Sequence, residues 1–300
     1  MSAAVQKTGE AGKGAGRDAA PRAVGVIGGG RMGAGVAQSF AAAGSRVTVV
    51  ESGAEAAAAA RDRVATGLAR AAERGKLAEP AETVLARVTT VASPEELPGE
   101  VQLVVEAVPE DAALKAKVLA AAERAVSDDT VLATNTSSLS VTELSTALRR
   151  PARFLGMHFF NPVPASALIE LVVAPDTADA TLESALAWTR ALGKTDVVVK
   201  DSPGFASSRL GLALGLEAVR MVEEGVAEPA AIDAAMSLGY KHPMGPLRLT
   251  DLVGLDVRLA IAEYLCATLG ERFAPPALLR EKVARGELGR KTGQGFYTWE

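Results

Sequence analysis

The stretch Val24-Gly25-Val26-Ile27-Gly28-Gly29-Gly30-Arg31-Met32-Gly33 decides the fold of this chain. Its first four residues predict a buried strand, and the segment after Gly30 predicts a helix that ends near Gly44. The glycines follow the spacing G-x-G-x-x-G: the first permits a tight turn, the second lets the backbone approach a pyrophosphate, and the third lets the helix pack closely on the strand. We therefore predict that residues 28–33 bind a dinucleotide.

An acidic residue follows the second predicted strand. Glu51 lies 23 positions after Gly28, near the ~20 expected of the carboxylate that binds the adenosine ribose. A carboxylate accepts a hydrogen bond from a 2′-hydroxyl but repels a 2′-phosphate, so Glu51 favours NAD over NADP. The alternative is that an Ala/Gly-rich chain produced the glycine spacing by chance and that Glu51 is a solvated charge.

Short strands alternate with longer helices as far as residue 204. Strands are predicted at Val24–Ile27, Arg46–Val50, Val88–Val91, Val101–Val108, Thr130–Thr134, Arg153–His158, Leu168–Val173 and Thr195–Val199, and helices at Met32–Ala43, Ala54–Arg74, Ala112–Ala125, Val141–Ala147 and Asp179–Leu192. Beyond Phe205 only helical periodicity is found, at Ala206–Glu224, Pro229–Leu238, Asp251–Leu269 and Pro276–Arg285.

This alternation predicts an α/β fold, a Rossmann-type doubly wound and mostly parallel sheet, followed by an all-helical C-terminal domain. We expect a flexible tail over residues 1–22, a dinucleotide-binding domain over 23–204, and a helical domain over 205–300 for substrate binding and dimerisation. The tail is small and polar, with too little apolar mass to offset the entropy of ordering.

Composition excludes several classes of protein. The chain has 300 residues, 48% hydrophobic content and a net charge of −4, which is typical of a globular protein and not of a nucleic-acid-binding protein. No apolar run is long enough to cross a membrane, and one cysteine, Cys266, cannot form an internal disulfide. We predict a cytoplasmic protein without nucleic-acid partners, membrane spans or a metal site.

Two groups of residues could carry acid–base chemistry. His158 ends one predicted strand and Glu170 lies twelve residues later in the next, a separation compatible with neighbouring antiparallel strands that pair imidazole with carboxylate. Such a pair could take a proton from an alcohol, although a buried structural histidine and a half-exposed Glu are the alternative. Asn135-Thr136-Ser137-Ser138 follows another strand, where hydroxyls could hold a substrate oxygen or cap the next helix.

These residues together resemble the L-3-hydroxyacyl-CoA dehydrogenase family, especially its bacterial 3-hydroxybutyryl-CoA branch. The resemblance covers Val24 to the C-terminus and is carried by VIGGGRMGAGVAQ (26–38), LVVEAVPED (103–111), ATNTSSLSVTEL (133–144), GMHFFNPVPASALIELV (156–172), KDSPGF (200–205), HPMGPLRLTDLVGLD (242–256) and GRKTGQGFY (289–297). It implies NAD-dependent interconversion of a 3-hydroxyacyl-CoA and a 3-ketoacyl-CoA by a homodimer.

The resemblance also implies roles for individual residues. His158 would be the catalytic base and Glu170 its orienting carboxylate, with Ser137 and Asn161 at the same site. The cofactor contacts would be Gly28, Gly29, Gly30, Arg31, Met32, Gly33, Glu51, Glu110, Lys115, Ser137, Asn161 and Lys291. Ser208 stands where the family commonly has a substrate-binding Asn, and Arg70, Arg74 and Lys76 are candidates for binding the CoA phosphates.

Two other functions fit the same motifs. A dehydrogenase of a free hydroxy acid such as L-gulonate would share the glycine turn and the NTSS segment, but HFFNPVP (158–164) favours the acyl-CoA branch. A non-catalytic NAD-binding relative would not need both His158 and Glu170.

Overall fold

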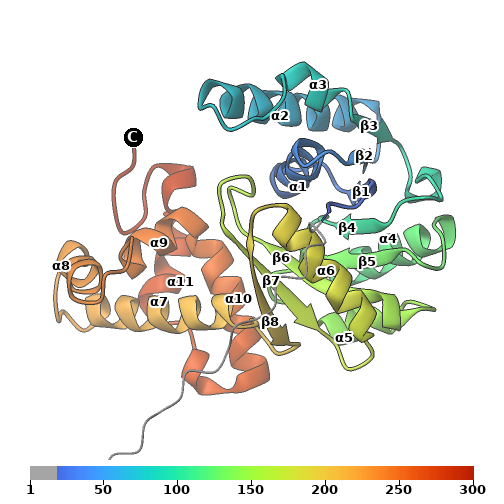
Figure 1. Ribbon diagram of the computed structural model, residues 1–300. Helices are drawn as coiled ribbons and strands as arrows, with labels where there is room; N and C mark the ends of the chain where they lie inside the picture. Colours follow the sequence, from blue (N-terminus) through green and yellow to red (C-terminus); the bar gives the residue numbers. More distant parts are fainter. Residues whose placement is uncertain (1–18) are drawn as a thin grey trace, which may run out of the picture.

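The computed structural model describes residues 19–300 and contains one eight-stranded sheet (Figure 1). Its strands are β1 (Ala23–Ile27), β2 (Arg46–Val50), β3 (Val88–Val91), β4 (Leu103–Glu106), β5 (Val131–Thr134), β6 (Phe154–Phe159), β7 (Leu168–Val173) and β8 (Thr195–Lys200). They lie in the order β3-β2-β1-β4-β5-β6-β7-β8. The first six pair in parallel, whereas β7 runs antiparallel to β6 and parallel to β8. The predicted doubly wound, mostly parallel sheet is confirmed.

Helices cover both faces of this sheet, which explains why its central strands β1, β4 and β5 are apolar except for Glu106 and Thr134 at the ends of β4 and β5. One face packs against α1 (Arg31–Ala42), α2 (Ala54–Glu73), α3 (Ala81–Leu85) and α6 (Asp179–Ala191). The other face packs against α4 (Ala112–Ala125) and α5 (Val141–Ser145). The two layers of helices therefore bury two separate apolar cores, one on each side of the strands.

The strand order reverses between β1 and β4. The chain first builds outward from β1 to β3, then crosses back to place β4 on the other side of β1. In open sheets of this kind, ligands bind beyond the carboxyl ends of the strands at such a switch point. The glycine-rich turn, which follows β1, lies at that position.

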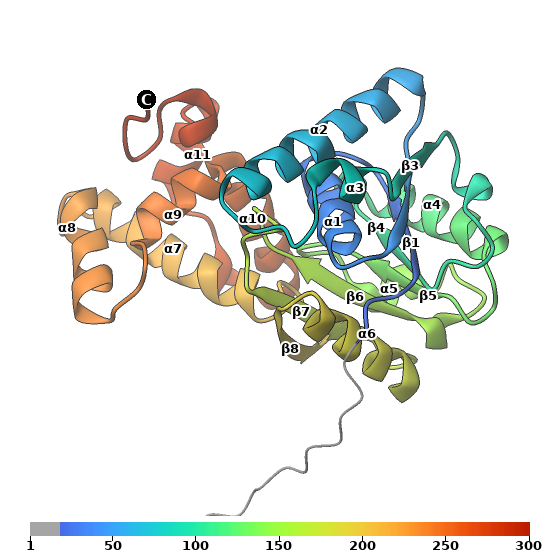
Figure 2. The ribbon, with the colours of Figure 1, turned by 45° about the horizontal axis from the view of Figure 1, so that its top comes forward.

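The second domain is helical and lies beside the carboxyl end of β6, where the antiparallel strand β7 begins (Figure 2). It contains α7 (Ser207–Glu223), α8 (Pro229–Ala234), α9 (Pro246–Val253), α10 (Leu255–Leu269) and α11 (Ala277–Ala284) around a third apolar core. No helix within residues 19–300 combines the length and the apolar character needed to cross a membrane.

Several predicted boundaries were wrong. The helix expected at Asp251–Leu269 is two helices, because the backbone of Gly254 turns to φ 107° between α9 and α10. The helix expected at Pro229–Leu238 ends as α8 and continues as a π-helical turn over Ala235–Gly239. The short α3 was not predicted, and the strand expected at Val101–Val108 is limited to β4.

The predicted tail over residues 1–22 falls mostly outside the described residues. At its end, however, Pro21 is buried and its carbonyl accepts a hydrogen bond from the Ser45 hydroxyl at 2.6 Å. The Arg22 amide donates to the Gln102 side chain at 2.5 Å. These two residues are thus held against the sheet and lead directly into β1.

Candidate active site

His158 and Glu170 form a buried pair across two strands. They are direct partners in the antiparallel register of β6 and β7, so both side chains project from the same face of the sheet. The His158 Nδ1 atom lies 2.8 Å from Glu170 Oε2, and the carboxylate is fully buried. The antiparallel pairing predicted from a twelve-residue separation is present, and it places an imidazole against a carboxylate.

The Glu170 carboxylate also joins the two domains. Its Oε1 atom accepts hydrogen bonds from the backbone amides of Ala206 at 3.1 Å and Ser207 at 2.9 Å, at the start of α7, and its Oε2 atom accepts one from the Ser207 hydroxyl. Burial would raise the pKa of Glu170, but the hydrogen bonds from His158 and Ser207 outweigh it and lower that pKa. Glu170 is therefore held as an anion that can orient an imidazole.

The imidazole of His158 lies between aromatic rings. Phe160 packs at 4.4 Å between ring centroids and Phe205 at 5.8 Å. With Nδ1 bound to Glu170 as a donor, the neutral ring presents the lone pair of Nε2. Nε2 makes no hydrogen bond to any residue within 19–300, so it can accept a proton from an alcohol.

The glycine-rich turn fits a dinucleotide pyrophosphate. Gly28 has φ 92°, and a Cβ there would lie 2.9 Å from the Ala107 carbonyl oxygen. A Cβ on Gly33 would overlap the Gly28 carbonyl, whereas one on Gly30 would meet no atom within 4 Å. The first and third glycines are thus required by the fold, and Gly30, next to the exposed Arg31 and the half-buried Met32, leaves open space at the start of α1 where an anion is favoured.

Glu51 lies beside this turn. Its Oε1 atom accepts a hydrogen bond of 2.6 Å from the Gly29 amide, and Arg63 of α2 donates to the Gly29 carbonyl at 3.1 Å. The turn, the end of β2 and the start of α2 are thereby held together. Glu51 is half-buried and stands where the carboxylate that binds the ribose is expected.

Glu110 and Lys115 form a second polar network, next to β4 and β5. Glu110 Oε1 accepts hydrogen bonds from the Thr136 hydroxyl at 2.6 Å and from the amides of Ser137 and Ser138 at 2.9 and 3.2 Å. Lys115 is 1% exposed, and its Nζ lies 2.8 Å from Glu106 and 3.3 Å from Glu110. Burial raises the pKa of Glu106 despite the neighbouring ammonium, whereas Lys115 and the hydrogen bonds lower the pKa of Glu110 against the effect of its burial.

The contacts of Lys115 tie this network together. Its ammonium lies between Glu106, Glu110 and the Val108 carbonyl, so it positions Glu110 and, through Glu110, the backbone of Ser137. The cofactor contact of Lys115 that the family resemblance implies stays a prediction.

The remaining predicted residues lie in different places. Asn161 is exposed in the loop after β6, and Ser208 is half-buried without a hydrogen bond from its hydroxyl within residues 19–300. Lys291 pairs with Asp256 at 2.5 Å inside the helical domain, beside Gly254, and not with the glycine turn. Three exposed cations at the C-terminal end of α2 form no ion pair with a described carboxylate: Arg70, Arg74 and Lys76.

Three further residues support the site, and the sequence analysis singled out only one of them, Asn135. The Ser207 hydroxyl, not that of Ser208, contacts Glu170. The Asn135 side chain accepts a hydrogen bond from the Phe159 amide at 2.8 Å, next to His158. Buried Lys194 donates to the carbonyls of Val163 at 2.7 Å and Ser166 at 2.5 Å, which holds the loop between β6 and β7. The Asn135-Thr136-Ser137-Ser138 motif pointed to Asn135, but no local pattern marked the other two.

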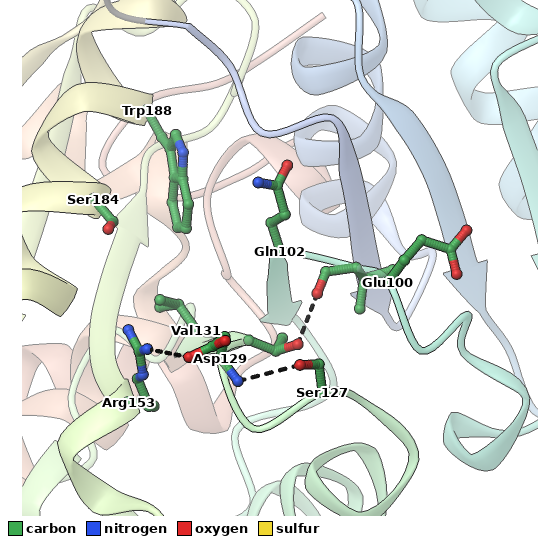
Figure 3. A pocket seen from close by; sticks show the side chains of 10 residues that line it. Glu100, Gln102, Ser127, Asp129, Val131, Arg153, Ser184 and Trp188 are labelled. Atoms are coloured by element: carbon green, nitrogen blue, oxygen red, sulfur yellow. Dashed lines mark hydrogen bonds and ion pairs between the residues drawn. The ribbon is translucent and has the colours of Figure 1, made fainter.

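A cavity at the opposite end of the sheet is a different feature (Figure 3). It lies at the amino ends of β4, β5 and β6 and is lined by Gln102, Asp129, Arg153 and Trp188 among others, with Arg153 paired to Asp129 at 2.8 Å. None of the predicted catalytic or cofactor residues lines it.

The chain matches known proteins over both domains. The NAD binding domain of 3-hydroxyacyl-CoA dehydrogenase matches residues 23–202, and the C-terminal domain of 3-hydroxyacyl-CoA dehydrogenase matches residues 204–299. The probable 3-hydroxybutyryl-CoA dehydrogenase of Bacillus subtilis is 43% identical over 277 residues, which cover 92% of this chain and 96% of that protein.

Two solved structures share the whole fold. The crystal structure of Mycobacterium tuberculosis FadB2 superimposes with a TM-score of 0.90 at 41% identity, covering 94% of this chain and 100% of that one. The (S)-3-hydroxybutyryl-CoA dehydrogenase of Ralstonia eutropha gives a TM-score of 0.88 at 40% identity, also covering 94% and 100%. The family resemblance noted in the sequence is thus confirmed: this chain, with its NAD-binding domain and its helical C-terminal domain, belongs to the 3-hydroxyacyl-CoA dehydrogenase family.

Proposed function

We propose that this protein interconverts an L-3-hydroxyacyl-CoA and the corresponding 3-ketoacyl-CoA with NAD, and that a short acyl chain such as 3-hydroxybutyryl is accepted. The observation that carries the proposal is the 2.8 Å contact between His158 Nδ1 and Glu170, because it leaves a proton acceptor at Nε2. The relatives named as 3-hydroxybutyryl-CoA dehydrogenases support the substrate class.

The cofactor, His158 and Glu170 would have separate roles in the reaction. NAD⁺, when bound, accepts the hydride from C3 of the hydroxyacyl group. Nε2 of His158 takes the proton of the 3-hydroxyl in that direction, and in the reverse direction the imidazolium returns it to the forming alkoxide. The Glu170 anion fixes the ring orientation and stabilises the imidazolium as its charge develops.

Other residues would hold the two ligands. Gly28–Gly33 and the start of α1 would bind the pyrophosphate, and Glu51 would accept a hydrogen bond from the adenosine ribose. Ser137, held by Glu110, would contact substrate and nicotinamide. Asn161 would also lie at this site, and Ser208 would contact the substrate directly or through a water molecule.

Formation of NADH from L-3-hydroxybutyryl-CoA tests the proposal, with L-gulonate as the competing substrate. His158→Gln should lower kcat by about 10²–10⁴-fold while NAD⁺ affinity stays nearly unchanged, which is the usual effect of a positioned acid–base group. His242→Gln is the matched control, because His242 is the only other histidine. Wild-type turnover by His158→Gln would refute the mechanism, and turnover of L-gulonate alone would refute the substrate assignment.

The protein is further proposed to act as a homodimer in the cytoplasm. Exposed apolar side chains on α7, α9 and α10 support the dimer: Leu210 is 70% exposed, and Leu249, Val253 and Val257 are each about 40% exposed. Exposed apolar side chains on a domain that already has its own core are expected at a protein interface.

A further inference from the structure

Arg258 of α10 is a buried cation that has no partner within the described part of the chain. It is 6% exposed and lies in line with the core residues Leu255, Ala262 and Leu265. Its Nε atom has no hydrogen-bond partner, and the guanidinium forms no ion pair with a carboxylate within residues 19–300. Burial lowers the pKa of Arg258 to about 10, and no neighbouring acid offsets this. A buried guanidinium is costly unless an anion binds to it. We therefore expect Arg258 to bind an anion.

The position of the guanidinium relates it to the active site. A Cβ on Gly211 of α7 would lie 3.6 Å from one Arg258 Nη atom and 3.9 Å from the other, and would meet nothing else within 4 Å outside its own helix and chain neighbours. Ser207 and Gly211 are four residues apart and share one face of α7. Because the Ser207 hydroxyl contacts Glu170, Arg258 faces α7 one helical turn, about 6 Å along the axis, beyond the catalytic pair.

A second buried polar group, the hydroxyl of Thr250 on α9, faces the same strip of α7. It has no hydrogen-bond partner within residues 19–300 and lies 3.1 Å from where a Cβ of Gly215 would be. Gly215 follows Gly211 by four residues. Two successive turns of α7 therefore present a glycine to a polar side chain whose hydrogen-bonding capacity is not used.

We propose that Arg258 binds a carboxylate at the distal end of the acyl chain, so that the preferred substrates are 3-hydroxyacyl-CoA thioesters of dicarboxylic acids. This rests on the proposed function. A carboxylate accepts two parallel hydrogen bonds from a guanidinium, and the position one turn from Ser207 suits the end of a chain that extends a few carbons beyond C3. The thioester, and hence the CoA, lies on the other side of C3.

Two other anions fit less well. The CoA phosphates are separated from the reacting carbon by the whole pantetheine arm, too far for a group this close to Glu170. A carboxylate from a second subunit would approach the exposed apolar side chains, such as Leu210 of α7 and Val257 of α10. Each of these precedes Gly211 or Arg258 by one residue and is therefore rotated about 100° around its helix, toward a different face.

The test compares two substrates that differ only at the chain end: 3-hydroxyhexanoyl-CoA, which ends in a methyl group, and 3-hydroxyadipyl-CoA, which ends in a carboxylate. The wild-type enzyme should have at least a tenfold higher kcat/KM for the carboxylate. Arg258→Met should bring the ratio of the two kcat/KM values to one or below, mainly through KM. Arg258→Lys should retain part of the preference, because it keeps the charge but not the paired donors.

The outcomes separate this inference from the proposed function. Wild-type turnover of 3-hydroxybutyryl-CoA together with equal or better use of the methyl-ended chain would overturn the role of Arg258 alone. An equal loss on both substrates in Arg258→Met would also overturn it, since that indicates a structural role. If thermal denaturation shows that Arg258→Met is not folded, the ratio of the two kcat/KM values in the wild type and in Arg258→Lys still tests the role of Arg258. No turnover of any 3-hydroxyacyl-CoA would instead refute the proposed function.

Discussion

Replacing Glu170 by Gln should reverse the tautomer of His158. The Gln oxygen will face the amides of Ala206 and Ser207, which are fixed donors at the start of α7 and now bind Glu170 Oε1 at 3.1 and 2.9 Å. The amide nitrogen is then directed at His158 Nδ1, which must become an acceptor. The ring proton moves to Nε2, the atom required to take the proton of the substrate.

The size of the effect distinguishes this mechanism from a simple loss of contact. Loss of one neutral hydrogen bond would cost about 0.5–1.5 kcal/mol, or roughly tenfold in rate. An imidazole held in the wrong tautomer costs about 10⁴-fold in a well-characterised serine-protease example. We therefore expect Glu170→Gln to lower kcat by about 10³–10⁴-fold, with NAD⁺ affinity nearly unchanged.

Initial rates of NADH formation at saturating 3-hydroxybutyryl-CoA measure the effect. Ser207→Ala is the matched control, because it removes a hydrogen bond to the same carboxylate and leaves the tautomer alone; its kcat should fall by no more than tenfold. The chain has two histidines, so ¹⁵N spectra can identify the protonated nitrogen of His158 directly. A Glu170→Gln enzyme within tenfold of wild type, or one whose proton stays on Nδ1, would refute the reasoning.

The same carboxylate should contribute to stability in acid. Because the folded state lowers the pKa of Glu170 below its ordinary 4.5, its contribution is complete above that pH and is lost as the pH falls through the folded value. Denaturation in urea between pH 3 and 6 should show a shallower acid-side loss of stability in Glu170→Gln than in the wild type. Equal slopes for both proteins would contradict this.

Three further predictions follow from the site. Glu51, fixed beside the turn by Gly29, should give at least a tenfold preference for NAD⁺ over NADP⁺ in kcat/KM, since about 1.4 kcal/mol suffices; equal values would exclude its role at the ribose. Ser208→Ala should lower kcat/KM for 3-hydroxybutyryl-CoA by at most about tenfold, and a larger loss would mean that Ser208 does more than donate one hydrogen bond. Light scattering at micromolar concentration should give the mass of a dimer that Leu210→Glu weakens, and a monomeric wild type would exclude the proposed interface.

The Glu170 carboxylate also has a structural role, because it connects the two domains. Its carboxylate lies on β7 of the first domain and accepts hydrogen bonds from the start of α7 in the second. The group that orients His158 thus also fixes how the helical domain begins. For each Glu170 variant, thermal denaturation should therefore be measured together with the rate, so that a loss of stability is distinguished from a loss of catalysis.

The sequence by itself determined the sheet, the glycine-rich turn and the pairing of His158 with Glu170. Strand alternation and the spacing of Gly28, Gly30 and Gly33 depend on local backbone conformation and on which positions tolerate a Cβ, so they can be read along the chain. His158 and Glu170 could be paired because antiparallel neighbours joined by a short loop have a predictable register.

Only the tertiary structure decided which neighbouring residue carries each contact. Ser207 and Ser208 differ by about 100° of rotation around α7, and the docking of that helix on β7 determines which hydroxyl reaches Glu170. The crossing of α4 over the sheet likewise places the Lys115 ammonium between Glu106 and Glu110, two contacts that its position in the sequence did not predict. Arg258 showed no local signal, since its lack of a partner within residues 19–300 depends on which helices pack around it. These features depend on distances between elements far apart in the chain, and no local periodicity contains them.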